Sequence, residues 1–195
     1  MNMTTLEALK KHLRAGETYR RAELAQWSKS VDRHLQALIR SGLLKKQSVG
    51  LYYCPKHSDF GEVPADEYKL VRTFLKDDRF LLTSLNDYNS LGLGTTQLYN
   101  RRLVYNHKRH GEFVLGGRTY DFRIKHHFPK QAVTKEFLLV DLMNNLDELA
   151  EDHEALRASV CEKALQMDRV RLKQAVHKFA GVSTKKFFAS LFHVQ

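Results

Sequence analysis

The chain has 195 residues, of which 43% are hydrophobic and 28% are charged, and its formal net charge is +10. This composition excludes an intrinsically disordered chain and predicts a soluble globular protein with one large domain or two small ones. No apolar run reaches the length of a membrane span, so no membrane partner is expected. Cys54 and Cys161 fit no disulfide or zinc spacing, which favours a reduced, cytoplasmic protein.

The positive charge is concentrated at the N-terminal end. Residues 1–58 contain 11 Lys or Arg against 4 Asp or Glu, residues 59–130 contain 12 against 9, and residues 131–195 contain 9 of each. Phosphate binding depends on clustered positive charge, so the basic first segment indicates a surface for a polyanion. On charge alone, a basic surface that serves only solubility fits equally well.

Three short helices are predicted in this basic segment. Leu6, Leu9 and Leu13 are spaced for one buried face of a first helix. A second helix is predicted over residues 22–27, and a third over residues 28–42, where a glycine ends it.

The third helix has two unlike faces. Val31, Leu35, Leu38 and Ile39 are spaced i, i+4, i+7 and i+8, which predicts that they are buried together. The other face is basic and rich in hydrogen-bonding groups, with only Asp32 on its flank as an acid. Its members, with the residues at the start of the helix, are Lys29, Ser30, Arg33, Gln36, Ala37 and Arg40.

A basic hairpin follows this helix. Residues 43–47 and 51–54 predict two strands around a turn that contains Gly50. Three helices and a basic hairpin are typical of a winged helix-turn-helix, whose third helix enters the major groove of DNA. Arginine and glutamine pair with base edges, while Lys45 and Lys46 suit phosphates. We therefore expect residues 1–58 to be a DNA-binding domain; the alternative is a winged helix that binds only protein.

The remainder, residues 59–195, predicts a second domain of α+β type with a small antiparallel meander and a C-terminal helical bundle. Residues 57–64 are expected to be a linker between the two domains. Helices are expected over 65–76, 84–91, 134–149, 153–166, 168–180 and 183–192, a strand over 79–83, and the meander over 102–125. The fold class is therefore α+β, with an N-terminal winged helix-turn-helix.

No catalytic, cofactor or metal site is predicted. The Gly92–Gly94 segment lacks the spacing of a phosphate-binding loop. Asp121 and Lys125 resemble the acid and lysine of a nuclease strand, but no second carboxylate sits two residues before the lysine. Four histidines of the meander region lack a third metal ligand at a convincing spacing and are expected to be solvated: His107, His110, His126 and His127. We expect a protein that is not an enzyme.

Several segments resemble the antitoxins of AbiE-type (type IV) toxin–antitoxin systems. The sequence GLYYCP at residues 50–55, preceded by SVDRHLQALIRSGLLKK, is similar to the glycine–hydrophobic–tyrosine wing of that family. RFLLTSLNDYNSLGLGTTQLYNRRLVYN and VLGGRTYDFRI are similar to its strand, short helix and glycine hairpin. Together these segments lie within residues 28–125, and Leu85-Asn86-Asp87 departs from the small residue that the family carries there.

The resemblance implies an antitoxin that represses its own operon. In that family the winged helix binds inverted repeats of double-stranded operator DNA, which favours a homodimer on the DNA. The antitoxin counters a nucleotidyltransferase-like toxin without requiring a stable complex with it. The operator-binding set implied here is Lys29, Arg33, Gln36, Arg40, Lys45 and Lys46.

Two other function classes stay open. One is a winged-helix transcription factor unrelated to any toxin, which senses a ligand or partner through its C-terminal domain. The other is a nucleic-acid enzyme whose active site carries no recognised motif. An adjacent gene for a nucleotidyltransferase-like protein would favour the antitoxin over the transcription factor.

Overall fold

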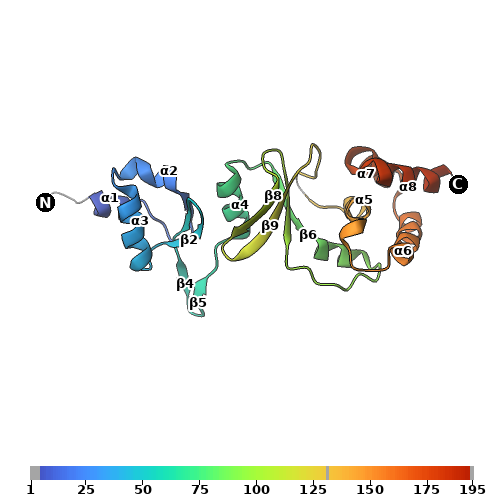
Figure 1. Ribbon diagram of the computed structural model, residues 1–195. Helices are drawn as coiled ribbons and strands as arrows, with labels where there is room; N and C mark the ends of the chain where they lie inside the picture. Colours follow the sequence, from blue (N-terminus) through green and yellow to red (C-terminus); the bar gives the residue numbers. More distant parts are fainter. Residues whose placement is uncertain (1–4, 131, 194–195) are drawn as a thin grey trace. The chain divides into compact units, whose positions relative to one another are not determined.

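The computed structural model of the chain describes residues 5–130 and 132–193 (Figure 1). Contacts along the backbone divide the chain into two compact units. The first unit comprises the chain up to residue 78 together with residues 112–120, and the second comprises residues 79–111 and the chain from residue 121. The domain boundary that the sequence predicts at 58/59 therefore falls inside the first unit.

The first unit begins with three helical segments and a small sheet. Its helical segments are α1 (Thr5–Lys11), α2 (Arg21–Leu24), the 3-10 helix η1 (Ala25–Trp27) and α3 (Val31–Arg40). Its first three strands are β1 (Thr18–Arg20), β2 (Lys45–Ser48) and β3 (Leu51–Tyr53). Strand β3 pairs antiparallel with both others, in the order β1-β3-β2. Strand β1 is too short to show an alternating pattern, and the sequence analysis does not predict it.

An aliphatic core holds these elements together. Leu9, Leu24 and Leu38 are almost fully buried and belong to one cluster, to which Leu44 of the following loop is added. Such burial stabilises by about 25 cal/mol for each Å² of apolar surface removed from water. Trp27 packs against this cluster and stacks on His12, with ring centroids 4.3 Å apart.

A hairpin stands where the sequence predicts a linker. Strands β4 (Lys56–Ser58) and β5 (Gly61–Val63) pair antiparallel, so most of residues 57–64 belong to a hairpin. The Tyr53 hydroxyl donates a hydrogen bond of 2.7 Å to the Val63 carbonyl, which joins the end of the hairpin to β3.

Helix α4 (Glu67–Leu75) follows and also belongs to the first unit. The Arg20 guanidinium donates to the carbonyls of Thr73 and Phe74 at 3.1 and 2.8 Å, and Lys69 forms an ion pair with Glu17. These bonds explain why α4 groups with residues before 58.

A four-stranded sheet follows, with the strand order β6-β7-β9-β8. Its strands are β6 (Phe80–Ser84), β7 (Arg102–Asn106), β8 (Gly111–Leu115) and β9 (Arg118–Ile124). The 3-10 helix η2 (Leu85–Leu91) follows β6. Because β9 lies between β7 and β8, the three strands over 102–125 are not the simple meander that the sequence predicts. Gly116 and Gly117 have φ angles of 59° and 81°, which suits the tight turn between β8 and β9.

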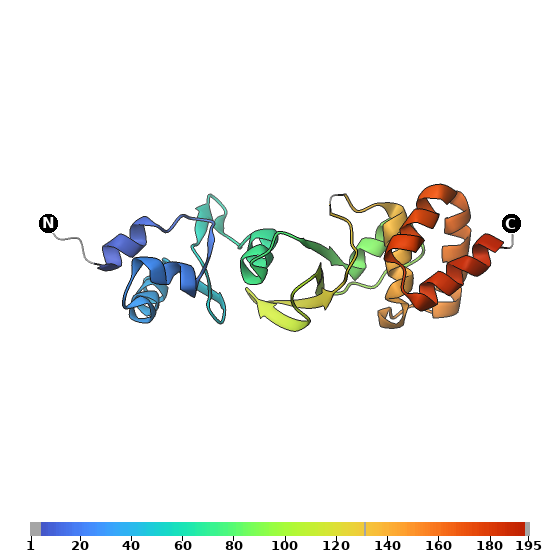
Figure 2. The same ribbon diagram turned by 90° about the horizontal axis from the view of Figure 1, so that it is seen from above.

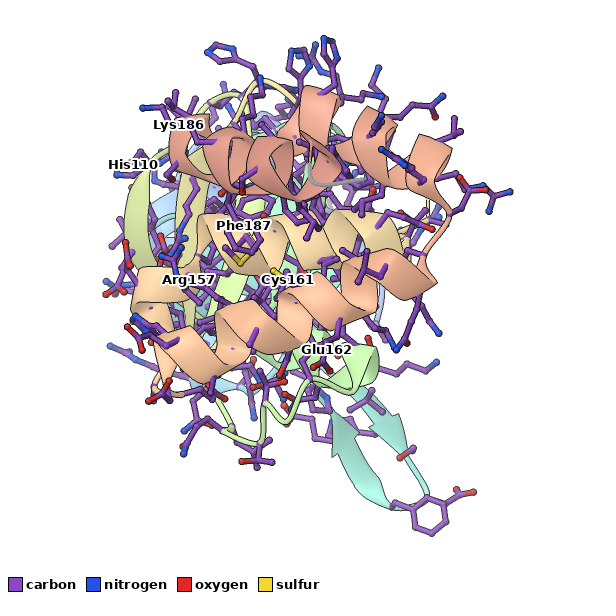
Figure 3. All side chains as sticks on the ribbon, turned by 90° about the vertical axis from the view of Figure 1, so that its right-hand side faces the viewer. His110, Arg157, Cys161, Glu162, Lys186 and Phe187 are labelled. Atoms are coloured by element: carbon purple, nitrogen blue, oxygen red, sulfur yellow. The ribbon has the colours of Figure 1, made fainter. Side chains whose placement is uncertain are left out.

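Helices fill the C-terminal part of the second unit, as expected (Figure 2). They are α5 (Lys135–Asn144), the 3-10 helix η3 (Leu146–Glu148), α6 (His153–Gln166), α7 (Arg169–Phe179) and α8 (Val182–His193). Helix α5 is buried along most of its length and packs on α7 and α8. Arg157 of α6 lies over the ring of Phe187 of α8, 5.9 Å from its centroid (Figure 3). The chain is thus a mixed α+β protein with a helical C-terminal part.

Candidate nucleic-acid interface

Helix α3 presents the side chains that the sequence assigns to DNA. Val31, Leu35 and Leu38 are buried against the core, which fixes the opposite face toward solvent. All predicted members of that face and the helix start are exposed: Lys29, Ser30, Arg33, Gln36, Ala37 and Arg40. Two arginines and one amide are therefore exposed on α3, and Lys29 is exposed just before the helix begins.

A buried histidine fixes the start of α3. His34 is 6% exposed, and its Nδ1 lies 2.7 Å from the hydroxyl of Ser28, which is 4% exposed. This pair satisfies two polar groups inside the core. Ile39, which the sequence places on the buried face, is 37% exposed, so that expectation is wrong. The buried stripe follows positions 31, 34, 35 and 38, and residue 39 lies beside it.

The single acid on α3 is neutralised. Asp32 forms an ion pair with Arg21 of α2, whose Nε donates to Oδ1 at 2.7 Å. The hydrogen bond from Arg21 lowers the pKa of the Asp32 carboxyl. The carboxylate therefore does not offset the positive charge of Arg33 beside it. Arg21 was not among the predicted site residues, because its partner Asp32 lies 11 residues away on another helix.

The two lysines of the predicted wing have different surroundings. Both lie on β2 and are exposed. The Lys45 ammonium is 2.6 Å from Glu62 of β5, so its charge is already paired. Both lysines also border a hollow of about 370 Å³ that Glu62 and Gly116 help to line. Lys46 is therefore better suited than Lys45 to a phosphate.

A second polar cluster lies in the second unit, between the sheet and α5. Asp141 is 1% exposed and accepts hydrogen bonds from the hydroxyls of Tyr88 at 2.9 Å and Tyr105 at 2.8 Å. The Lys125 ammonium lies 3.0 Å from the same carboxylate. The Asn145 amide donates to both tyrosine hydroxyls. Burial and the neighbouring Asp141 raise the pKa of both tyrosines well above the usual value.

Arg123 connects this cluster to acidic side chains nearer the surface. Arg123 donates to the Asn145 side-chain oxygen at 2.8 Å and forms ion pairs with Asp121 and Glu148. Asp121 and Lys125, which the sequence compares with a nuclease strand, thus have separate partners. Asp141 was not among the predicted site residues, although one acid within the apolar run EFLLVDLM is a visible signal.

The described residues were also compared with the requirements of membrane helices, metal sites and reactive thiols. No helix there is long and apolar enough to cross a membrane. No three His, Cys, Asp or Glu side chains within residues 5–130 and 132–193 are gathered as metal ligands. Cys54 and Cys161 are free, and burial raises the pKa of both thiols, which reduces their thiolate fraction.

Comparison with known proteins shows a fold relationship. No protein-family model and no curated protein matches the chain. Among solved structures, the chain is similar to the crystal structure of RV2827C protein from Mycobacterium tuberculosis, with a TM-score of 0.57 and 14% sequence identity. The match covers 95% of this chain and 74% of that one. At this identity the likeness concerns the fold alone.

Proposed function

We propose that this chain binds double-stranded DNA through α3 and represses transcription, with its first unit acting as a winged helix-turn-helix. The order α1-β1-α2-α3-β2-β3 and the sheet order β1-β3-β2 support this proposal, because they supply a third helix and a following hairpin. The observation that carries it is the exposed face of α3, where Arg33 and Gln36 stand beside an acid already paired with Arg21.

In this proposal the side chains have separate tasks. Arg33 and Gln36 read base edges in the major groove. Lys29, Arg40 and Lys46 bind phosphates and fix the position of the helix, while Lys45 contributes less because Glu62 holds it. Two copies of the chain would bind the two halves of an inverted repeat.

We further propose, on the sequence resemblance, that the regulated operon is the chain's own and encodes a nucleotidyltransferase-like toxin. The chain would then be an antitoxin of the AbiE type in the cytoplasm. A regulator that senses a small ligand through its second unit is the competing proposal, and a basic cavity in that unit, described below, favours it.

DNA binding is tested with a pair of matched variants. We expect Arg33→Ala to weaken binding to the operator upstream of the gene by about 1–3 kcal/mol, the size of one lost base contact. Arg171→Ala removes an exposed arginine of α7 and should leave affinity unchanged. Fluorescence anisotropy at fixed salt, on operator and scrambled duplexes, measures both. Unchanged affinity of the Arg33→Ala variant would show that this face of α3 does not contact DNA.

The antitoxin role is tested separately. The wild-type chain should rescue cells that express the toxin of the adjacent gene, and a variant with Arg33→Ala and Arg40→Ala should lose repression yet still rescue. A promoter reporter in the same cells measures repression. Rescue that disappears together with repression would contradict two separate activities. Absence of any rescue by the wild-type chain would favour the ligand-sensing regulator.

A further inference from the structure

A basic cavity of about 610 Å³ lies in the second unit, where β9 ends and α7 meets α8. This volume is within the range of small-molecule sites, which is roughly 300–1,000 Å³. No Asp or Glu is among the described residues that line it. Six of the lining residues are basic: Lys125, His126, His127, His177, Lys178 and Lys185.

Lys125 is held in place at the wall of this cavity. Its ammonium lies 3.0 Å from the buried Asp141 carboxylate and 3.7 Å from the centroid of the Tyr105 ring. The carboxylate is itself fixed by hydrogen bonds from Tyr88 and Tyr105. The Lys125 side chain keeps 27% of its surface exposed. A lysine ammonium has three donors, so one that is oriented in this way still has donors for a ligand.

Two hydrogen bonds hold another part of the lining. The Asn144 side chain donates to the Phe179 carbonyl at 3.0 Å and accepts from the Gly181 N–H at 2.8 Å. Both bonds hold the connection between α7 and α8, which carries Lys178 on one side and Lys185 on the other. Basic side chains from the segment after β9, from α7 and from α8 therefore line one cavity.

The composition of the walls indicates the ligand. Lysines at three positions favour a ligand with several negative charges, and lysine is a common phosphate binder. Histidine N–H groups add donors for phosphate oxygens. Half-buried Phe179 and Ala180 supply an apolar section of the wall that suits a base.

We propose that this cavity binds a nucleoside di- or triphosphate. The phosphates contact Lys178 and Lys185, Lys125 contributes less because Asp141 already pairs with it, and the base lies toward Phe179. The proposal goes beyond DNA binding and does not depend on α3. Its ligand is a small molecule, because the fixed basic groups come from three elements around one cavity of mononucleotide size.

The test is calorimetric titration of the full chain with ATP, ADP, AMP and inorganic pyrophosphate at constant ionic strength. ATP and ADP should bind saturably and more tightly than AMP. Replacing Lys178 and Lys185 together with glutamine should weaken ATP binding by about 10- to 100-fold, because two charge-assisted hydrogen bonds are lost. Both lysines are exposed, so this variant keeps the buried Asp141 cluster intact.

The matched control removes two charges from the same helices. Arg171 of α7 and Lys186 of α8 (labelled in Figure 3) are exposed and do not line the cavity. Their joint replacement by glutamine should change ATP affinity by less than about twofold, as expected for charges outside the site. Equal losses in both double variants, or no saturable binding at millimolar ATP, would each overturn the proposal. The titration contains no DNA, so its outcome is separate from that of the α3 test.

Discussion

The two units place their charges in opposite ways. In the first unit the core is mainly aliphatic, and ion pairs such as Arg21–Asp32 and Lys69–Glu17 lie at the surface. In the second unit Asp141 is buried with two tyrosines and Asn145. An exposed pair contributes about 0–1 kcal/mol, whereas a buried cluster loses several kcal/mol when one member is removed. Charged side chains of the first unit are thus exposed and can bind a partner. In the second unit some charged side chains, such as Asp141, stabilise the fold.

The largest effect should come from breaking the buried cluster. Asp141→Ala leaves the Lys125 ammonium and the two tyrosine hydroxyls without their acceptor, and we expect a loss of about 3–5 kcal/mol of stability. Urea unfolding measures it, with the exposed Asp147→Ala as control. DNA binding below the unfolding transition should be unchanged. A loss under about 1 kcal/mol, the size of an exposed pair, would mean that the cluster is not structural.

The aliphatic core of the first unit should respond to a cavity. Leu38 is 1% exposed, and Leu38→Ala should cost about 2–5 kcal/mol. Ile39→Ala, one residue further along the same helix, should cost less than about 1 kcal/mol because Ile39 is 37% exposed. Thermal unfolding of both variants measures the difference. Equal losses of stability in the two variants would indicate that Ile39 is buried like Leu38, as the sequence predicts.

A smaller effect distinguishes the two lysines of β2. If Lys46 binds a phosphate, Lys46→Ala should lower the slope of log K against log salt by about 0.9. Lys45→Ala should lower it by less, because Glu62 already pairs with Lys45. Operator binding at four or more salt concentrations gives both slopes. The reverse order would mean that the β4–β5 hairpin releases Lys45 on DNA.

The smallest effect is spectroscopic. Because the folded pKa values of Tyr88 and Tyr105 are raised, these residues stabilise the fold fully below the ordinary tyrosine pKa near 10. That contribution is lost as the pH rises through the higher folded values. An alkaline absorbance titration should therefore show a late step that coincides with unfolding. Tyr88→Phe should reduce its amplitude, and a titration in which all tyrosines ionise near pH 10 in the folded protein would contradict this.

The sequence predicts those parts of the fold that depend on local pattern. The exposed face of α3 follows from apolar spacing, and the four C-terminal helices lie close to the ranges that the sequence predicts. The DNA-binding role of the α3 face is still a prediction, since a pattern identifies an exposed basic surface and not its partner.

Features that depend on distant pairing were not predicted. Strand β1 has three residues and is defined by its neighbour β3, more than 30 residues later. The position of β9 between β7 and β8 is a matter of pairing between strands, which the residue pattern within each strand does not specify. The basic cavity joins residues from 125 to 185, and only the fold brings them together.

The turn between β8 and β9 has a consequence for how the protein is made. The Gly116 N–H donates to the Gln47 carbonyl at 2.9 Å, and residues 112–120 belong to the first unit. A ribosome synthesises residues 79–111, which belong to the second unit, before this closing turn emerges. Domains generally fold from the N-terminal end during synthesis. The hydrogen bond from Gly116 to Gln47 can therefore form only after about 120 residues have left the exit tunnel, when residues 112–120 join the first unit.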